Sequence, residues 1–149
     1  MARFRYRMQN ILNIKEKQEE QQKSAFAAAQ ARLLSEEEKL EELKKRRAMY
    51  VEEGNELRKE AVPAIDIIEN NNAVNVMDEM IASQRSNVLR AEKQVELERQ
   101  RLTEAMQERK MHERLREKAW EAFLWEERAE EAKINDERSS FVYGGKTGD

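Results

Sequence analysis

The strongest constraint on this chain is a stripe of residues, from Phe26 to Leu57, that are spaced alternately three and four positions apart. The spacing holds without interruption through Phe26, Ala29, Leu33, Glu36, Leu40, Leu43, Arg47, Tyr50, Gly54 and Leu57. Such heptad spacing keeps one face of an α-helix turned toward a partner helix. Because a single helix cannot bury this face alone, we expect a second helix to cover it.

A second stripe with the same spacing runs from Ile67 to Phe123, and Pro63 stands between the two stripes. Proline cannot donate a hydrogen bond within a helix and disfavours helical geometry in the residue before it, so we expect the chain to turn there. If the chain folds back at this point, the residue numbers of facing positions add to a nearly constant value. The facing pairs predicted in this way are Phe4 with Phe123, Met8 with Ala119, Leu12 with Leu115, Phe26 with Leu102, Leu33 with Val95, Leu40 with Val88, Leu43 with Gln84, and Tyr50 with Met77.

These patterns predict an all-α fold in which two long helices form an antiparallel coiled-coil hairpin. We expect a single rod over residues 1–138, with helix 1 at about 4–60, a turn at about 61–66 and helix 2 at about 67–138. The asparagines from Asn70 to Asn72 compete for backbone hydrogen bonds, so irregular backbone can extend to about residue 72. Residues 139–149 contain three glycines and no periodicity, and we expect them to form a flexible tail.

The composition favours long helices over a compact globular core. The 149 residues are 40% charged and 6% aromatic, and they include one proline. High charge and low hydrophobicity are also typical of disordered chains, but the unbroken heptads weigh against disorder. On the second stripe apolar residues thin out after Leu102, and there we expect Leu115, one position off the stripe, to take over.

Charge and apolar runs exclude several partners. The net charge of −3 is too small to indicate a polyanionic partner, and acidic residues flank the basic run Lys44–Arg47, so no nucleic acid is expected. No apolar run of about 18 residues exists, so no transmembrane segment is expected. No apolar core follows the first arginines, which argues against a secretory signal. The absence of cysteine suits a reducing compartment.

Catalytic chemistry is not expected. The phosphate-binding loop, the nucleophile elbow and the zinc-protease motif are all missing from the sequence. His112 is the only histidine, and it lies between basic residues on the second stripe, so we expect neither a metal-binding nor a catalytic role. A two-helix rod also offers no concave dry pocket. We therefore expect no enzyme, no catalytic or cofactor-binding residue, and no bound metal or cofactor.

The open end of the predicted hairpin combines basic and aromatic residues. The first nine residues hold three arginines and no acid, which indicates either a solvated start or a basic tip that contacts an acidic partner. An apolar cluster is formed on helix 2 by Trp120, Phe123, Leu124 and Trp125. We expect this cluster to pack on Phe4, Tyr6 and Met8, because so many exposed aromatic residues would be a liability. The alternative is an anchor for a partner.

The start of the chain resembles the flagellar export protein family FliJ. Residues 4–15 read Phe-Arg-Tyr-Arg-Met-Gln-Asn-Ile-Leu-Asn-Ile-Lys, with Glu19 following, and are similar to the family pattern F-x-Y-R-L-x-x-L-L-x-x-K. Near the other end, Glu131, Lys133 and Asp136-Glu137 resemble an E-x-K-x-x-D-E pattern. The chain departs from the family at Met8, which replaces a leucine, and at Asn135, where an apolar residue is more usual.

The resemblance implies a component of the flagellar type III protein export apparatus, in bacterial flagellum biogenesis, protein transport and motility. Family members are coiled coils similar to the stalk of rotary ATPases. Their termini enter the hexameric export ATPase and promote its activity, their mid-chain end contacts the cytoplasmic domain of the export gate, and they are thought to handle export chaperones. The implied location is cytoplasmic, peripheral at the cytoplasmic face of the inner membrane.

Two sets of candidate contact residues follow from the family match and from position along the rod. For the ATPase ring the candidates are Arg3, Arg5, Arg7, Lys15, Glu131, Asp136 and Glu137. For the export gate the candidates are Leu43, Tyr50, Met77, Met80 and Gln84. Met80 is the more telling gate residue because it lies off the stripe, whereas the others are equally explained as residues that pack between the helices.

Two other classes stay open on the sequence alone. One is a structural coiled coil that oligomerises as a tether. The other is a chaperone-like adaptor that binds non-native clients.

Overall fold

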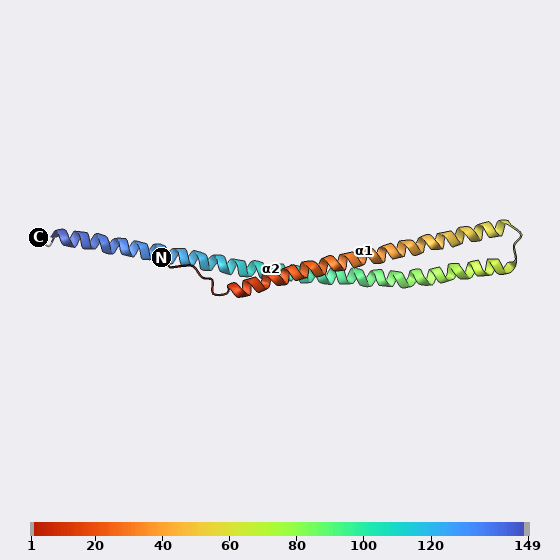
Figure 1. Cartoon of the computed structure of the whole chain (residues 1–149), viewed down its shortest axis with the longest axis horizontal. Helices are drawn as coiled ribbons and strands as arrows, with labels where there is room; N and C mark the ends of the chain where they lie inside the picture. The colour runs from red at the N-terminus through yellow and green to blue at the C-terminus, as the bar shows by residue number, and fades with distance from the viewer. Residues whose placement is uncertain (1, 148–149) are drawn as a thin grey trace. The chain divides into compact units, whose positions relative to one another are not determined.

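The structure is a computed structural model that describes the backbone of residues 2–147 and the side chains of residues 2–144. The described residues form two helices, α1 (Gln9–Lys59) and α2 (Ala64–Thr147), and no strand (Figure 1). The helices pack against each other as a hairpin, which confirms the predicted all-α fold class. Contacts group the chain into two compact units, and the single rod expected from the sequence stays a prediction. Unit 1 comprises residues 1–20 and 104–149, and unit 2 comprises residues 21–103.

Unit 2 contains the predicted interface between the stripes. Every position of the first stripe, from Phe26 to Leu57, is buried or half-buried, and so is every position of the second stripe from Ile67 to Leu102. The buried apolar residues of this unit are Ala29, Met77, Ile81, Val88, Ala91 and Val95. Burying a Val or Ile side chain fully is worth about 1.5–3 kcal/mol, so these layers supply the main stabilisation of the unit.

The register in unit 2 differs from the predicted pairing by about one helical turn. Asn70 packs against Gly54, where an added Cβ would lie 2.3 Å from Oδ1 of Asn70. Gln84, which we predicted to face Leu43, instead donates from Nε2 to the backbone oxygen of Glu36 at 2.9 Å. The antiparallel arrangement is as predicted, but the residues of each stripe, which together form the seam between the helices, face other partners than predicted.

The turn explains this shift in register. It spans residues 60–63, and α2 begins at Ala64, directly after Pro63 and earlier than expected. A proline is well tolerated next to the start of a helix, where an N–H group would lack an intrahelical acceptor anyway. The backbone oxygen of Pro63 accepts a hydrogen bond from the backbone N–H of Asp66 at 3.1 Å. The midpoint of the hairpin therefore lies nearer α1 than predicted, and the facing positions move with it.

The asparagines from Asn70 to Asn72 are helical, whereas irregular backbone was allowed for. The side chains of Asn70 and Asn71 reach across the hairpin and so do not compete for their own backbone. Nδ2 of Asn70 donates to the backbone oxygen of Tyr50 at 2.8 Å. Oδ1 of Asn71 accepts a hydrogen bond from Arg58 at 3.2 Å. These two bonds remove the reason for expecting a break.

Unit 1 has a different interface, in which ion pairs replace most of the apolar layers. Leu12 is its best-buried apolar side chain, at 3% exposure. Leu115, which we expected to take over the seam, is 43% exposed, so this prediction was wrong. His112 stays on the seam and is half-buried, and its Nδ1 atom is buried without a hydrogen-bond partner. The predicted pairing of Leu12 with Leu115 is therefore absent.

Both ends of the chain differ from the expected bounds. α1 begins at Gln9, not near residue 4, because the residues before it lie along α2 and place Phe4 on an aromatic cluster. α2 continues to Thr147, so residues 139–147 of the expected tail are helical. Gly148 and Asp149, the last two residues of that tail, lie outside the described residues.

Candidate interaction surfaces

The aromatic cluster of unit 1 confirms part of the expected packing at the start of the chain. The ring of Phe4 meets Trp120 edge-on, with centroids 4.9 Å apart, and lies 5.4 Å from the ring of Phe123. The guanidinium of Arg116 lies over the ring of Phe4, 5.7 Å from its centroid. Trp125, which was expected to join this cluster, is 73% exposed. The cluster therefore holds Phe4 on α2, whereas Met8, which was also expected there, is 41% exposed and Trp125 lies in solvent.

The candidate ring contacts all lie in unit 1, and most of them are exposed. The exposed members are Arg3, Arg5, Arg7, Glu131, Asp136 and Glu137. The last three project from the part of α2 beyond residue 127, where every described side chain up to residue 144 is exposed. These charged side chains are accessible to a partner.

Lys15 differs from the other ring candidates because it is engaged inside unit 1. Its Nζ atom lies 2.6 Å from Oε2 of Glu108, and the residue is half-buried. This contact, through its hydrogen bond and its charge, lowers the pKa of Glu108. A second ionic layer follows, in which Arg109 pairs with Glu19 and, at 2.8 Å, with Glu113. Lys15 therefore helps to hold α1 on α2.

The candidate gate contacts lie in unit 2, and only one of them is exposed. Met80 is 41% exposed, whereas Met77 and Gln84 are buried and Leu43 and Tyr50 are half-buried. The four enclosed residues belong to the interface between α1 and α2. Met80 is the member of the set that presents an apolar side chain to solvent.

Gln84 belongs to a buried polar layer. Besides the backbone oxygen of Glu36, its Nε2 atom contacts Oε2 of Glu36 at 2.5 Å, and its Oε1 atom accepts a hydrogen bond from Asn87 at 3.2 Å. The hydrogen bond from Gln84 is the main cause that lowers the pKa of Glu36, and it outweighs the opposing effect of burial. A hydrogen-bonded polar layer of this kind fixes the register of a coiled coil at some cost in stability.

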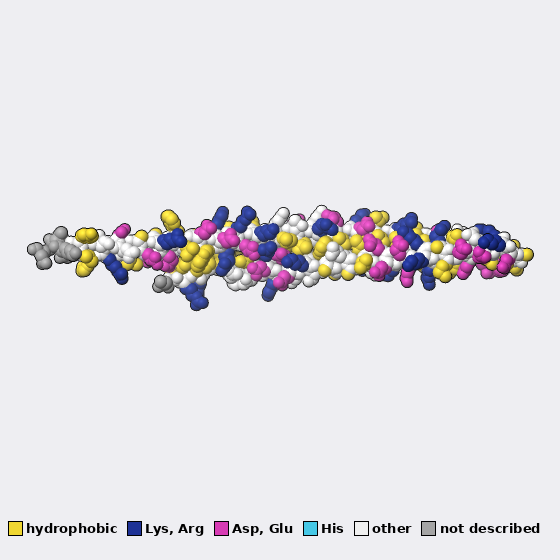
Figure 2. All heavy atoms as spheres, turned by 90° about the horizontal axis from the view of Figure 1, so that it is seen from above, with side chains coloured by type: hydrophobic (Ala, Val, Ile, Leu, Met, Phe, Trp, Pro, Cys, Tyr) yellow, Lys and Arg dark blue, Asp and Glu magenta, His cyan; other side chains and the backbone are white. Residues whose placement is uncertain are grey.

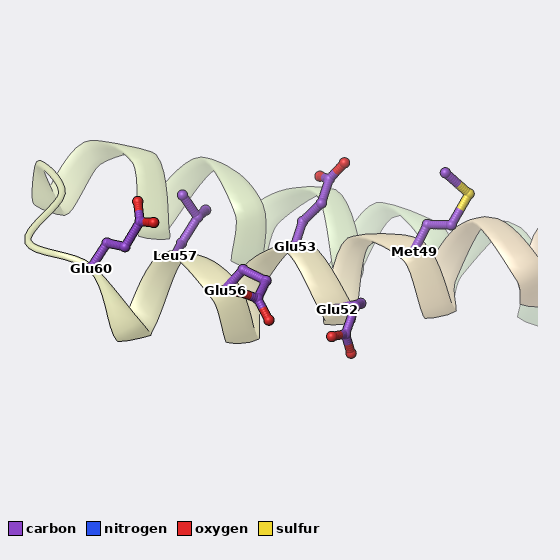
Figure 3. A pocket seen from close by; sticks show the side chains of 6 residues that line it. All are labelled: Met49, Glu52, Glu53, Glu56, Leu57 and Glu60. Atoms are coloured by element: carbon purple, nitrogen blue, oxygen red, sulfur yellow. The ribbon is translucent and has the colours of Figure 1, made fainter.

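Sequence reasoning missed the exposed apolar residues around the turn. Large exposed side chains of this region are Met49, Ile65, Ile68 and Val76, in addition to Met80. A shallow groove near the turn is lined by Met49, Glu52, Glu53, Glu56 and Leu57 from α1 and by Glu60 from the turn (Figure 3). The sequence does contain a signal for the exposed apolar residues Met49, Ile65, Ile68 and Val76, because they lie off the two stripes. An apolar residue off the stripe has no partner helix to cover it.

Among residues 2–147, no group of three or more His, Cys, Asp or Glu side chains is arranged to hold a metal ion. Within the same described part of the chain, neither helix contains an apolar stretch long enough to cross a membrane.

Comparisons with known proteins agree with this architecture. A family model described as flagellar FliJ protein matches residues 4–148. The solved structure of CT670 from Chlamydia trachomatis, described as a YscO homolog, is similar with a TM-score of 0.73 and 23% identity. The match covers 95% of this chain and 96% of that chain, and at this identity it shows a shared fold. No curated protein matches the sequence. Because the family model covers nearly the whole chain, this chain belongs to the FliJ family and is a coiled-coil protein related to type III export.

Proposed function

We propose that this protein is a stalk-like component of the flagellar type III export apparatus that enters the hexameric export ATPase, promotes its activity and links it to the export gate. The observation that carries the proposal is the family match over residues 4–148. In this role the protein is cytoplasmic and is held peripherally at the cytoplasmic face of the inner membrane through its partners. Its task is mechanical and regulatory, and it has no catalytic chemistry of its own.

We place the ring contact on the exposed charges of unit 1. Arginines 3, 5 and 7 and the acidic side chains beyond residue 127 are accessible, and charges at a rim steer association and fix orientation more than they add affinity. Lys15 contributes indirectly in this proposal, because it is paired with Glu108 and keeps the start of α1 in place.

The ring contact is tested with full-length variants in an ATPase assay with the cognate export ATPase. We expect the wild-type chain to raise the rate, and Arg3→Glu/Arg5→Glu/Arg7→Glu to require a higher concentration for the same rate. The control is Lys17→Glu/Lys45→Glu/Arg46→Glu, which makes the same change in net charge at exposed positions. An intact chain that leaves the rate unchanged would remove the ring assignment.

We place the gate contact on the exposed apolar residues around the turn, with Met80 as its tested member. A Met80→Asp variant should lose binding to the cytoplasmic domain of the gate in calorimetry while its thermal unfolding stays unchanged, because the side chain is exposed. Met77→Asp buries a charge between the helices and should lower the unfolding temperature. Gate binding by Met80→Asp at wild-type strength would rule out this surface.

A further inference from the structure

The outer face of α2 in unit 1 carries a groove that takes no part in the proposed contacts with the ring and the gate. The groove is lined by Gln107, Lys110, Met111, Arg114, Leu115 and Lys118. Met111 is 53% exposed and Leu115 is 43% exposed. On the other side of the helix, Ala105, Arg109 and His112 are half-buried at the seam, so the groove lies on the face that α1 leaves uncovered.

The residues of this groove form two rows along the helix. Lys110, Arg114 and Lys118 repeat every four residues, and Met111 with Leu115 repeat at the same spacing one position later. Positions four apart lie one above the other on a helix, at a rise of about 6 Å. A cationic row therefore runs beside an apolar row. Elsewhere on the protein, Figure 2 shows both signs of charge interspersed over the visible face.

The three cations of the groove have no ion-pair partner among the described residues. In the described part of the chain, none of Lys110, Arg114 and Lys118 forms an ion pair, although a glutamate follows each of them by three residues, and the first of these, Glu113, pairs with Arg109 instead. By contrast, Arg109 on the seam side of the same segment is paired with Glu19 and Glu113. The groove thus presents available positive charge next to exposed apolar surface.

We propose that this face of α2 docks an acidic amphipathic helix of a partner protein. The partner lays apolar side chains on Met111 and Leu115 and aligns carboxylates with the cationic row, since both rows have the one-turn repeat of a helix. Charge complementarity argues for this occupant, and exposed apolar pairs beside ordered charges mark interaction sites. The inference does not depend on the proposed stalk function.

An anionic membrane is a poorer match to the same face. Residues 104–127 contain seven acidic and five basic side chains, so the segment as a whole has no positive excess to attract a lipid surface. The positive charge of the groove is ordered only locally, and a helical partner with carboxylates at the same spacing can match it. A second copy of this chain also carries an acidic groove, at residues 49–60, and the sedimentation measurement below distinguishes this occupant from a partner protein.

The test uses the full-length chain and a dye-labelled synthetic helix with leucines on one face and glutamates along both flanks. Its matched twin carries lysines in place of the glutamates. We expect the glutamate peptide to bind in fluorescence anisotropy and the lysine twin to bind at least about tenfold more weakly, because three exposed ion pairs of ordinary strength give about that factor. The variant Lys110→Glu/Arg114→Glu/Lys118→Glu should reverse the preference between the peptides.

The control variant is again Lys17→Glu/Lys45→Glu/Arg46→Glu, which has the same net charge as the groove variant and should keep the wild-type preference. Circular dichroism checks that both variants remain helical. Equal binding of the two peptides, or an unchanged preference in the groove variant, would overturn the proposal. So would wild-type binding to phosphatidylserine vesicles alone, or self-association of the wild-type chain in sedimentation that the groove variant abolishes.

Discussion

At the scale of single residues, Gly54 shows how one glycine lets a side chain of α2 approach the backbone of α1 closely. Gly54 is buried near the C-terminal end of α1, and within a helix glycine costs about 1 kcal/mol relative to alanine. The cost is offset because Asn70 occupies the space that a Cβ would need, 2.3 Å from its Oδ1 atom, and donates to the backbone oxygen of Tyr50. Glycine at this position thus permits a side chain of α2 to bond to the backbone of α1.

This contact predicts a coupling between two substitutions. Gly54→Ala alone should be neutral or destabilising, because the gain in helix propensity is cancelled by displacing Asn70 from its hydrogen bond, worth about 0.5–1.5 kcal/mol. In an Asn70→Ala background the same change should stabilise by about 1 kcal/mol. Urea unfolding followed by circular dichroism measures all four members of the cycle. Additive effects would show that the two residues do not interact.

Glu36 makes a prediction about pH. Its pKa is lowered in the folded state, chiefly by the hydrogen bond from Gln84, so the ionised form is favoured by folding. A carboxylate of this kind contributes stability above its unfolded pKa, about 4.5, and loses that contribution as the pH falls through the lower folded value. The difference in urea midpoint between the wild-type chain and Glu36→Gln should therefore shrink on acidification below about pH 4.5. A difference that stays constant or grows would contradict this assignment.

At the scale of helices, the two units hold α1 and α2 together by different means. Unit 2 buries apolar layers such as Ile81, Val88 and Val95. Unit 1 uses ionic layers, in which Lys15 meets Glu108 and Arg109 meets Glu19. Salt screens partly exposed ion pairs but leaves apolar burial intact or strengthened. Unit 2 also contains one interhelical ion pair, Arg47 with Asp78, beside its apolar layers. The interface of unit 1 should therefore depend on ionic strength more strongly than that of unit 2.

This difference predicts the pattern of amide hydrogen exchange. In low salt, amides of residues 9–20 should exchange faster than those of residues 29–50, and raising sodium chloride to about 1 M should accelerate the first segment selectively. Replacing Lys15 and Glu108 together with leucine should reduce the salt effect, because the screened pair is gone. Uniform exchange in both segments, unaffected by salt, would show that the ionic layers do not control opening.

The sequence predicts the helices well and their register less well. Heptad spacing is a property of one helix, so the buried faces of both stripes in unit 2 followed directly from it. Register depends on the length of the turn, and nothing in the stripes fixes whether α2 starts at Ala64 or three residues later. Heptad spacing likewise does not predict the exposed groove beside Met111, because it identifies the covered face of a helix and carries no information about the opposite face.

At the scale of the molecule, a crosslinking experiment distinguishes a hairpin formed by one chain from a tether formed by two chains. The chain contains no cysteine, so an introduced pair reports on one contact. Ala29 and Val95 are both buried, and they face each other in the register that Asn70 and Gly54 define, whereas the stripes alone pair Val95 with Leu33. Mild oxidation of Ala29→Cys/Val95→Cys should give a disulfide within one chain.

The readout is mobility on a non-reducing gel at several protein concentrations. A hairpin gives a monomeric, crosslinked band whose yield does not depend on concentration, because both cysteines belong to the same molecule. Leu33→Cys/Val95→Cys is the matched control, and it should crosslink more slowly, since a shift of about one turn moves the Cα atoms by about 6 Å and a disulfide needs them within about 7 Å. Faster crosslinking of the control would restore the register predicted from the stripes. Disulfide-linked dimers whose yield rises with concentration would instead indicate two chains paired along their seams, which is the arrangement that an oligomerising tether requires and a stalk inside a ring does not.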